Sequence, residues 1–238
     1  MTRSLPRTMQ LAVTIIAATL GLSALAQAGP PLICHAIQIG QARSLPWTGE
    51  GWSGDGNYDV KNLAADTLAV LGPDTPVLVR METLRRATIY ARKDPRAAKE
   101  LLTRLYNRAT AAESAGQPEA LAWFDAGYLV ECYREWIGKD MPHMTDGLRL
   151  DSNPASGLDG YAWVEKAISL KGSDPQMEFA AALITIEGSP RDHRQHLQQA
   201  MAGAKSDPLL AQNLSSRFGG SNSPTMAELL ERTPRAEN

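Results

Sequence analysis

The sequence predicts an all-α protein, on two observations. First, Ser-Pro and Asp-Pro pairs recur along the chain, and glycines recur where the helices that they start are expected to end. Proline suits the first position of a helix, the residue before it can cap free amide groups, and glycine suits the left-handed turn after the last residue. Second, no segment between these marks alternates polar and apolar residues as a strand does. We therefore expect antiparallel helix pairs, in a right-handed array of repeats or in an irregular helical bundle.

The first 28 residues are typical of a secretory signal peptide. Arg3 and Arg7 precede an apolar run at 11–22, and small residues follow at positions suited to cleavage before Gly29 or Gln27. An uncleaved anchor is the less favoured alternative, because the run is shorter than the roughly 20 residues of a membrane-spanning helix. We expect an exported protein, periplasmic or secreted, without a stable membrane span after cleavage.

The rest of the chain divides into three parts by composition. Residues 29–58 are rich in proline, glycine and serine and predict an irregular arm, which Trp47 and Trp52 are large enough to anchor on an apolar surface. Residues 59–222 predict a helical domain that contains a long loop at 139–158, and residues 223–238 predict a short helix and a tail.

The helical domain and the tail can be divided into helices by their start and stop signals. The first expected helix has apolar residues along one face. Pro76 and Pro95 are each expected at the first position of a helix, and Asp159 is expected to cap one. Gly116 and Gly172 are expected to end helices. In chain order, helices are expected at 59–72, 76–93, 95–116, 118–138, 159–172, 175–188, from 190, at 208–219 and from 224.

The spacing of these helix pairs is close to that of tetratricopeptide repeats, which is roughly 34 residues. The segment Trp123-Phe-Asp-Ala-Gly127-Tyr-Leu-Val130 resembles the first-helix signature of that family, with Trp123 and Gly127 in register. It departs from the signature at Ala126 and Val130, and the residues 161–184 resemble a second repeat without the consensus glycine. The resemblance covers about two-thirds of the chain and implies stacked helix pairs with an extended binding surface.

The expected function is therefore binding or scaffolding, with a protein partner. The chain also resembles exported bacterial proteins of unassigned function through PPLICHAIQIGQARSLPW and VLVRMETLRRATIYAR, a resemblance that implies no activity and no site residues. An enzyme is unsupported, since GxSxG, GxxxxGK[ST], GxGxxG and HExxH are all missing from the sequence. No cofactor is expected.

Charge is unevenly distributed along the chain. Loss of Arg3 and Arg7 with the signal peptide changes the formal charge from -2 to -4, which argues against a nucleic-acid partner. Residues 74–116 carry nine basic and five acidic side chains, whereas residues 117–165 carry nine acidic and three basic ones. Arg85, Arg86 and Arg92 are the candidates for a face that attracts an acidic partner. The favoured alternative is that the acidic helices at 117–165 cover this basic stretch internally.

Two cysteines follow the signal peptide, Cys34 and Cys132. Export favours a disulfide between them, and two separate buried thiols are the equal alternative.

A metal- or haem-handling protein is the alternative function. Cys34 and His35 are ligand types for a soft metal or haem iron, and Met141, His143 and Met144 suit Cu(I). His193 and His196 share one side of a predicted helix, but the surrounding RDHRQHLQQ reads as a solvated helix face rather than as a zinc or nickel site.

Overall fold

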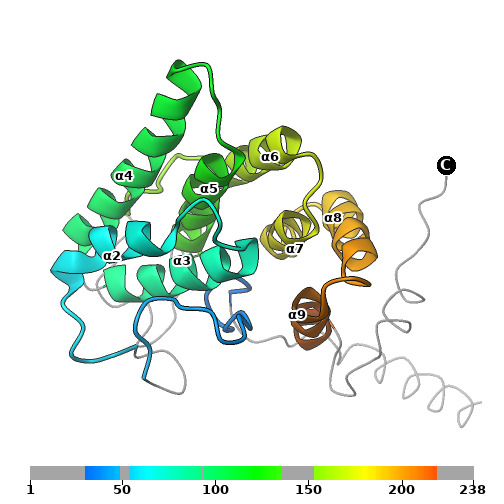
Figure 1. Cartoon of the computed structure of the whole chain (residues 1–238), viewed down its shortest axis with the longest axis horizontal. Helices are drawn as coiled ribbons and strands as arrows, with labels where there is room; N and C mark the ends of the chain where they lie inside the picture. Colours follow the sequence, from blue (N-terminus) through cyan, green and yellow to red (C-terminus); the bar gives the residue numbers. More distant parts are fainter. Residues whose placement is uncertain (1–29, 49–53, 93, 136–152, 219–238) are drawn as a thin grey trace, which may run out of the picture. The chain divides into compact units, whose positions relative to one another are not determined.

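The computed structural model of the chain describes residues 30–48, 54–92, 94–135 and 153–218. The chain divides into two units, Met1–Pro30 and Pro31–Asn238, and every helix described below lies in the second. Within the described residues there are eight α-helices and no strand, which confirms the all-α class (Figure 1). In chain order the elements are the 3-10 helix η1 (Val60–Asn62), α2 (Leu63–Val70), α3 (Val77–Ala91), α4 (Pro95–Ser114), α5 (Ala120–Arg134), α6 (Gly160–Lys171), α7 (Pro175–Ile184), α8 (Pro190–Gly203) and α9 (Pro208–Phe218).

α4, α6, α7 and α8 begin directly after capping residues that the sequence marks. The side chains of Asp94, Asp159, Asp174 and Ser189 each accept a hydrogen bond from an amide in the first turn of the helix that follows. Gly172 ends α6 in the left-handed conformation, at φ 75°.

Several boundaries differ from the prediction. α2 begins at Leu63, after the 3-10 helix η1, rather than at 59, and α3 begins at Val77 rather than at 76. α5 begins at Ala120 rather than at 118. α7 ends at Ile184, four residues before the predicted stop at Gly188, because the chain turns there and the amide of Gly188 donates to the carbonyl of Thr185.

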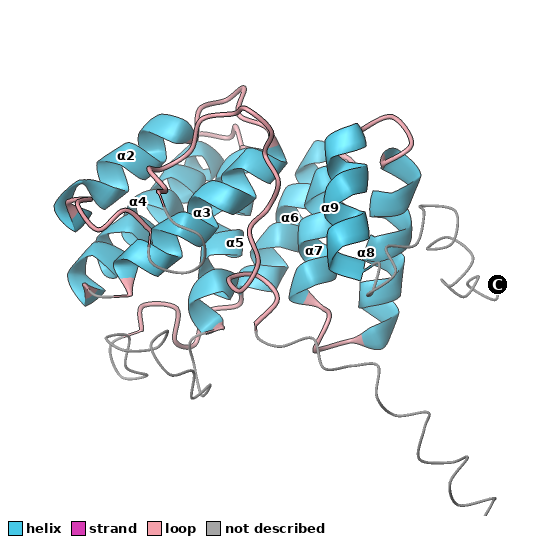
Figure 2. Cartoon of the chain, turned by 90° about the horizontal axis from the view of Figure 1, so that it is seen from below, coloured by secondary structure: helices cyan, strands magenta, loops and turns pink. Residues whose placement is uncertain are grey.

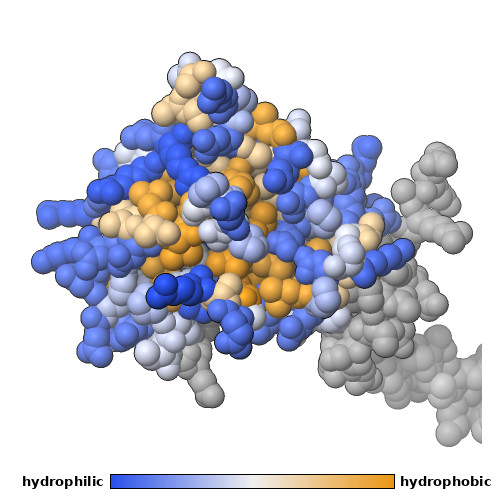
Figure 3. All heavy atoms as spheres, in the orientation of Figure 1, coloured by the Kyte–Doolittle hydropathy of each residue, from blue (hydrophilic) through white to orange (hydrophobic). Residues whose placement is uncertain are grey.

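The core is organised around α5, whose residues 122–133 are all buried. α5 packs against α3, α4, α6 and α7, and α8 packs against both α7 and α9. Figure 2 shows α6, α7, α8 and α9 lying next to one another. On the face seen in Figure 3, hydrophilic side chains surround a centre of apolar ones. The tetratricopeptide-like array stays a prediction.

α4 shows how the sequence pattern becomes packing. Its buried residues recur three and four positions apart and form one apolar stripe: Ala97, Ala98, Leu101, Leu102, Leu105 and Ala109. This is the spacing of one helix face. Polar and charged side chains such as Arg96, Lys99 and Arg104 fall outside the stripe and are exposed.

α3 is different, because it is buried almost all round although it carries three arginines. Arg80 has no exposed surface, and its guanidinium donates from Nη1 to Oδ2 of Asp125 on α5 at 2.6 Å. It also donates to the backbone carbonyls of Gly72 and Thr75, in the loop between α2 and α3. A buried charge needs such compensation, since removal from water costs several kcal/mol per ion. The pair therefore joins α3, α5 and the α2–α3 loop.

This pair predicts a pH dependence of folding. Burial raises the pKa of Asp125 to about 6, although Arg80 and Arg108 oppose the shift. The unfolded value is about 3.9, so the folded state binds the proton more tightly. The contribution of Asp125 to the unfolding free energy is then fully present below about pH 4 and is lost as the pH rises through 6, with a difference of about 3 kcal/mol.

We expect Asp125→Asn to remove this component. Urea unfolding at pH 4, 5, 6 and 7 gives the unfolding free energy of wild type and variant at each pH. The component due to Asp125 is the difference between the two proteins in how this free energy changes with pH. Identical pH dependence in the two proteins would contradict the assignment to Asp125.

Within the described ranges, no helix is both long enough and apolar enough to cross a membrane. The predicted helix from 224 and most of the predicted loop at 139–158 lie outside the described residues.

Candidate functional site

The arm is fastened to the helices through its backbone. From here on, "arm" means residues 30–48, which form turns and extended segments without a helix. The carboxylate of Glu135 accepts from the amides of Leu32 at 2.7 Å and Ile33 at 3.0 Å. Further along, the side chain of Asn213 on α9 both accepts from the amide of Gln38 and donates to its carbonyl. Polar side chains thus satisfy backbone groups that a helix or sheet would otherwise pair.

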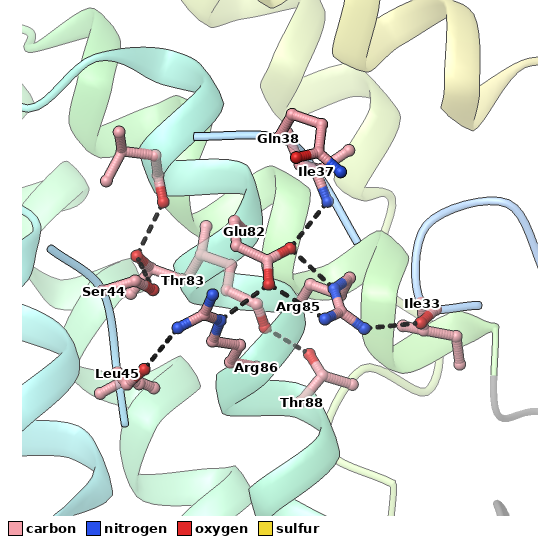
Figure 4. Close-up of polar contacts among 12 residues, drawn as sticks. Ile33, Ile37, Gln38, Ser44, Leu45, Glu82, Thr83, Arg85, Arg86 and Thr88 are labelled. Carbon is pink, nitrogen blue, oxygen red and sulfur yellow. Dashed lines mark hydrogen bonds and ion pairs between the residues drawn. The ribbon is translucent and has the colours of Figure 1, made fainter. Parts of the chain in front are cut away.

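Glu82 on α3 is the centre of the polar contacts between the arm and the helices (Figure 4). Its carboxylate accepts from the amide of Ile37 at 2.9 Å, from Arg85 Nε at 2.8 Å and Nη2 at 3.0 Å, and from Arg86 Nε at 2.7 Å. The four bonds use the acceptor capacity of an ionised carboxylate. Glu82 is therefore a saturated anion that holds two guanidinium groups in fixed positions.

Arg85 and Arg86 also bind the arm directly. Arg85 donates to the carbonyl of Ile33 at 3.2 Å, and Arg86 donates to that of Leu45 at 2.7 Å. Both guanidinium groups lie over the ring of Trp47, at 5.1 and 5.6 Å from its centroid. Of five N–H donors on each group, the bonds to described residues use three on Arg85 and two on Arg86, so within this part of the chain donors remain for a further acceptor.

These side chains line a cavity of about 490 Å³, which we call the arm pocket. The arm, α3 and α9 form its walls, with the following lining residues: Cys34, His35, Ala36, Gln38, Trp47, Glu82, Arg85, Arg86, Ser216 and Arg217. The volume is in the range of small-ligand sites, roughly 300–1,000 Å³.

Positive charge exceeds negative charge in the arm pocket. Three guanidinium groups line it against the single carboxylate of Glu82, an excess of two positive charges. Outside the lining, Glu135 also interacts with Arg217. Burial lowers the pKa of Arg217, and the positive charge of Arg85 acts in the same direction. An anion in the pocket would favour the charged form of this poorly solvated arginine.

His35 contributes a neutral ring to the pocket. Burial lowers its pKa, and the positive charges of Arg217 and Arg85 lower it further. Its Nε2 atom is buried and has no hydrogen-bond partner among the described residues.

The two cysteines do not form a disulfide in the structure. Cys132 is fully buried in α5, and burial raises the pKa of its thiol far above the usual range. Cys34 is partly exposed in the arm pocket. The hydrogen bonds to Glu82, Glu135 and Asn213 hold the arm without a covalent link.

The candidate basic face is covered rather than open. Arg85 is 3 % exposed and Arg86 18 %. Arg92, the residue after α3, is partly buried. The predicted cover by acidic helices holds for Arg80, which pairs with Asp125, but Arg85 and Arg86 are covered by Glu82 of their own helix and by the arm.

The solvated-face interpretation of the two histidines was wrong for His196. Its ring is buried, with Nδ1 2.6 Å from Glu178 Oε2 on α7 and Nε2 2.8 Å from the hydroxyl of Tyr161 on α6. His193 instead places Nδ1 2.8 Å from the carbonyl of Ala182. The error arose because α8 packs its histidine side against α7, where Glu178 and the carbonyl of Ala182 are polar partners for the two rings.

No group of three or more His, Cys, Asp or Glu side chains is placed to share a metal ion in the described part of the chain. Met141, His143 and Met144 lie outside it.

Sequence reasoning found Cys34, His35, Arg85 and Arg86 separately but did not bring them together. It missed Arg217 and the role of Trp47 as the ring beneath two arginines. Arg217 stands in an ordinary helical pattern, and no local signal marks it. Comparison with known proteins gave no match, since no family model fits the chain and no curated protein or solved structure is significantly similar to it.

Proposed function

We propose that this chain is an exported binding protein that captures its partner through an oxyanion, a carboxylate or phosphate group, in the arm pocket. The observation that carries the proposal is the pair of guanidinium groups held by Glu82, with donors left over. Guanidinium matches carboxylate and phosphate oxygens with two parallel hydrogen bonds. Since Glu82 and Trp47 fix both groups beforehand, little side-chain freedom is lost when an anion binds.

The arm pocket is less suited to the alternative function of metal or haem handling. Cys34 and His35 do line it, but they do so beside three guanidinium groups. A metal cation placed there would be repelled by the positive charges. The arrangement favours an anionic ligand over a cationic one.

Arg86→Gln tests the proposal. Arg86 is the more exposed of the two arginines and has the most unused donors, so its loss should weaken anion binding by about tenfold or more, because a hydrogen bond to a charged group contributes roughly 1.5–3 kcal/mol. Isothermal titration of the mature protein with inorganic phosphate, succinate and a glutamate-rich peptide measures this effect. Binding should also weaken as the salt concentration rises.

Arg104→Gln is the matched control, because Arg104 lies on the exposed face of α4 and pairs with Glu100 there. Binding of the peptide alone would identify a protein partner, and binding of phosphate or succinate would identify a small-molecule ligand. If none of the three probes binds saturably, or if Arg86→Gln binds as tightly as wild type, the proposal is wrong.

A further inference from the structure

A second cavity, of about 680 Å³, lies between α4, α6 and the segment that precedes α6. We call it the aromatic cavity, and its lining residues are Pro95, Arg96, Lys99, Leu102, Thr103, Tyr106, Asn153, Pro154, Leu158 and Trp163. Most of these side chains are apolar or aromatic. None belongs to the arm pocket, so the two sites are built from different residues.

One end of the aromatic cavity is an aromatic wall. The rings of Tyr106 on α4 and Trp163 on α6 are stacked, with centroids 5.1 Å apart and planes at 26°. Trp123 on α5 contacts both rings edge-on, and Lys166 lies 3.9 Å from the centroid of Trp123. Tyr106 nevertheless keeps 40 % of its surface exposed, which is unusual for a large apolar side chain in the described part of this chain. A planar ring can extend such a stack.

The other end of the aromatic cavity is basic. Arg96 and Lys99 line it, no carboxylate does, and neither cation has an ion pair among the described residues. By contrast, Arg104 on the same helix pairs with Glu100 at 2.7 Å. Positions 99, 103 and 106 follow one another along one face of α4, and the rise from Lys99 to Tyr106 is about 10 Å along the helix axis. Charge and apolar surface are thus separated by the length of a small organic molecule.

We infer that the aromatic cavity binds an aromatic carboxylate. Its ring would extend the Tyr106–Trp163 stack, and its carboxylate would accept hydrogen bonds from Arg96 and Lys99. An apolar pocket with a few convergent polar groups is the usual form of a small-ligand site. An uncharged ring would leave both cations without a partner, and an aliphatic acid would leave the stacking face of Tyr106 unused.

The inference is tested by titrating the mature protein with 2-naphthoate in a calorimeter. We expect saturable binding that persists in Arg86→Gln, where the arm pocket is weakened, and that Lys99→Gln and Arg96→Gln each weaken about five- to tenfold, since each removes a charged donor. Tyr106→Leu should weaken binding by a similar factor through loss of ring stacking. Both cations are exposed, so neither substitution threatens the fold, and circular dichroism verifies that Tyr106→Leu remains helical.

The control variants separate this site from the arm pocket. Arg104→Gln should bind 2-naphthoate as wild type does. Arg86→Gln weakens carboxylate binding to the arm pocket only, so the 2-naphthoate binding that persists in Arg86→Gln belongs to the aromatic cavity. Equal affinity for 2-naphthalenemethanol would show that the two cations do not recognise the carboxylate. Equal affinity for octanoate would show that the ligand need not be aromatic. Absence of saturable 2-naphthoate binding would show that the aromatic cavity is not a binding site for an aromatic carboxylate. Binding that is lost in Arg86→Gln but retained in Lys99→Gln would show the same.

Discussion

Replacement of Arg80 by methionine should lower the unfolding free energy by about 3–5 kcal/mol. The substitution leaves the carboxylate of Asp125 buried without the partner that now lies 2.6 Å away, and Arg108, at 3.9 Å, is beyond hydrogen-bonding distance of it. The carbonyls of Gly72 and Thr75 lose their donor at the same time. Urea unfolding followed by circular dichroism measures the loss.

Arg104→Met is the matched control for this prediction. The pair of Arg104 with Glu100 has nearly the same N–O distance, 2.7 Å, but half of each side chain is exposed. An exposed pair contributes at most about 1 kcal/mol, so the control should change stability little. An Arg80→Met variant no less stable than Arg104→Met would show that the buried pair does not hold α3 to α5.

The double variant Arg80→Met, Asp125→Leu sharpens the interpretation. Removal of one buried charge leaves the other uncompensated, whereas removal of both leaves an apolar pair. We expect the double variant to be less destabilised than the sum of the two single variants. Strict additivity would mean that the two side chains do not interact.

The helices could be predicted from the sequence because their signals are local. Asp94, Asp174 and Ser189 cap the turn that follows them, and the amides that they bind lie two or three residues away. The cap needs no information from the rest of the fold, so a residue pattern is sufficient.

The arm pocket could not be predicted, because distant contacts make it. Gln38 and Asn213 are 175 residues apart in sequence, and Ile37 and Glu82 are 45 apart. Composition suggested an irregular arm, but only tertiary structure places it on α3 and α9. The same reason explains the error at His196, where a polar sequence lies against the buried carboxylate of Glu178.

Gly127 is a case in which sequence and structure meet. It stands in the segment that resembles a tetratricopeptide signature, and in the structure it lies where α5 crosses α6. A Cβ atom on Gly127 would be 2.6 Å from the carbonyl oxygen of Gly160 and 2.9 Å from Cβ of Trp163. Reciprocally, a Cβ on Gly160 would meet the carbonyl oxygen of Gly127. The two glycines therefore allow the helix backbones to approach each other closely.

Gly127→Ala should consequently destabilise the protein by about 3 kcal/mol, at the upper end of the usual cost of overpacking, because backbone rather than a flexible side chain receives the new methyl group. The loss is informative because alanine in a helix interior is otherwise favoured over glycine by about 1 kcal/mol. Gly56→Ala is the control, since a Cβ there meets nothing within 4 Å. If α6 moves away to make room, Trp163 moves with it and the stack on Tyr106 opens, so binding of 2-naphthoate should fall together with stability. A Gly127→Ala protein as stable as Gly56→Ala would refute the close crossing of α5 and α6.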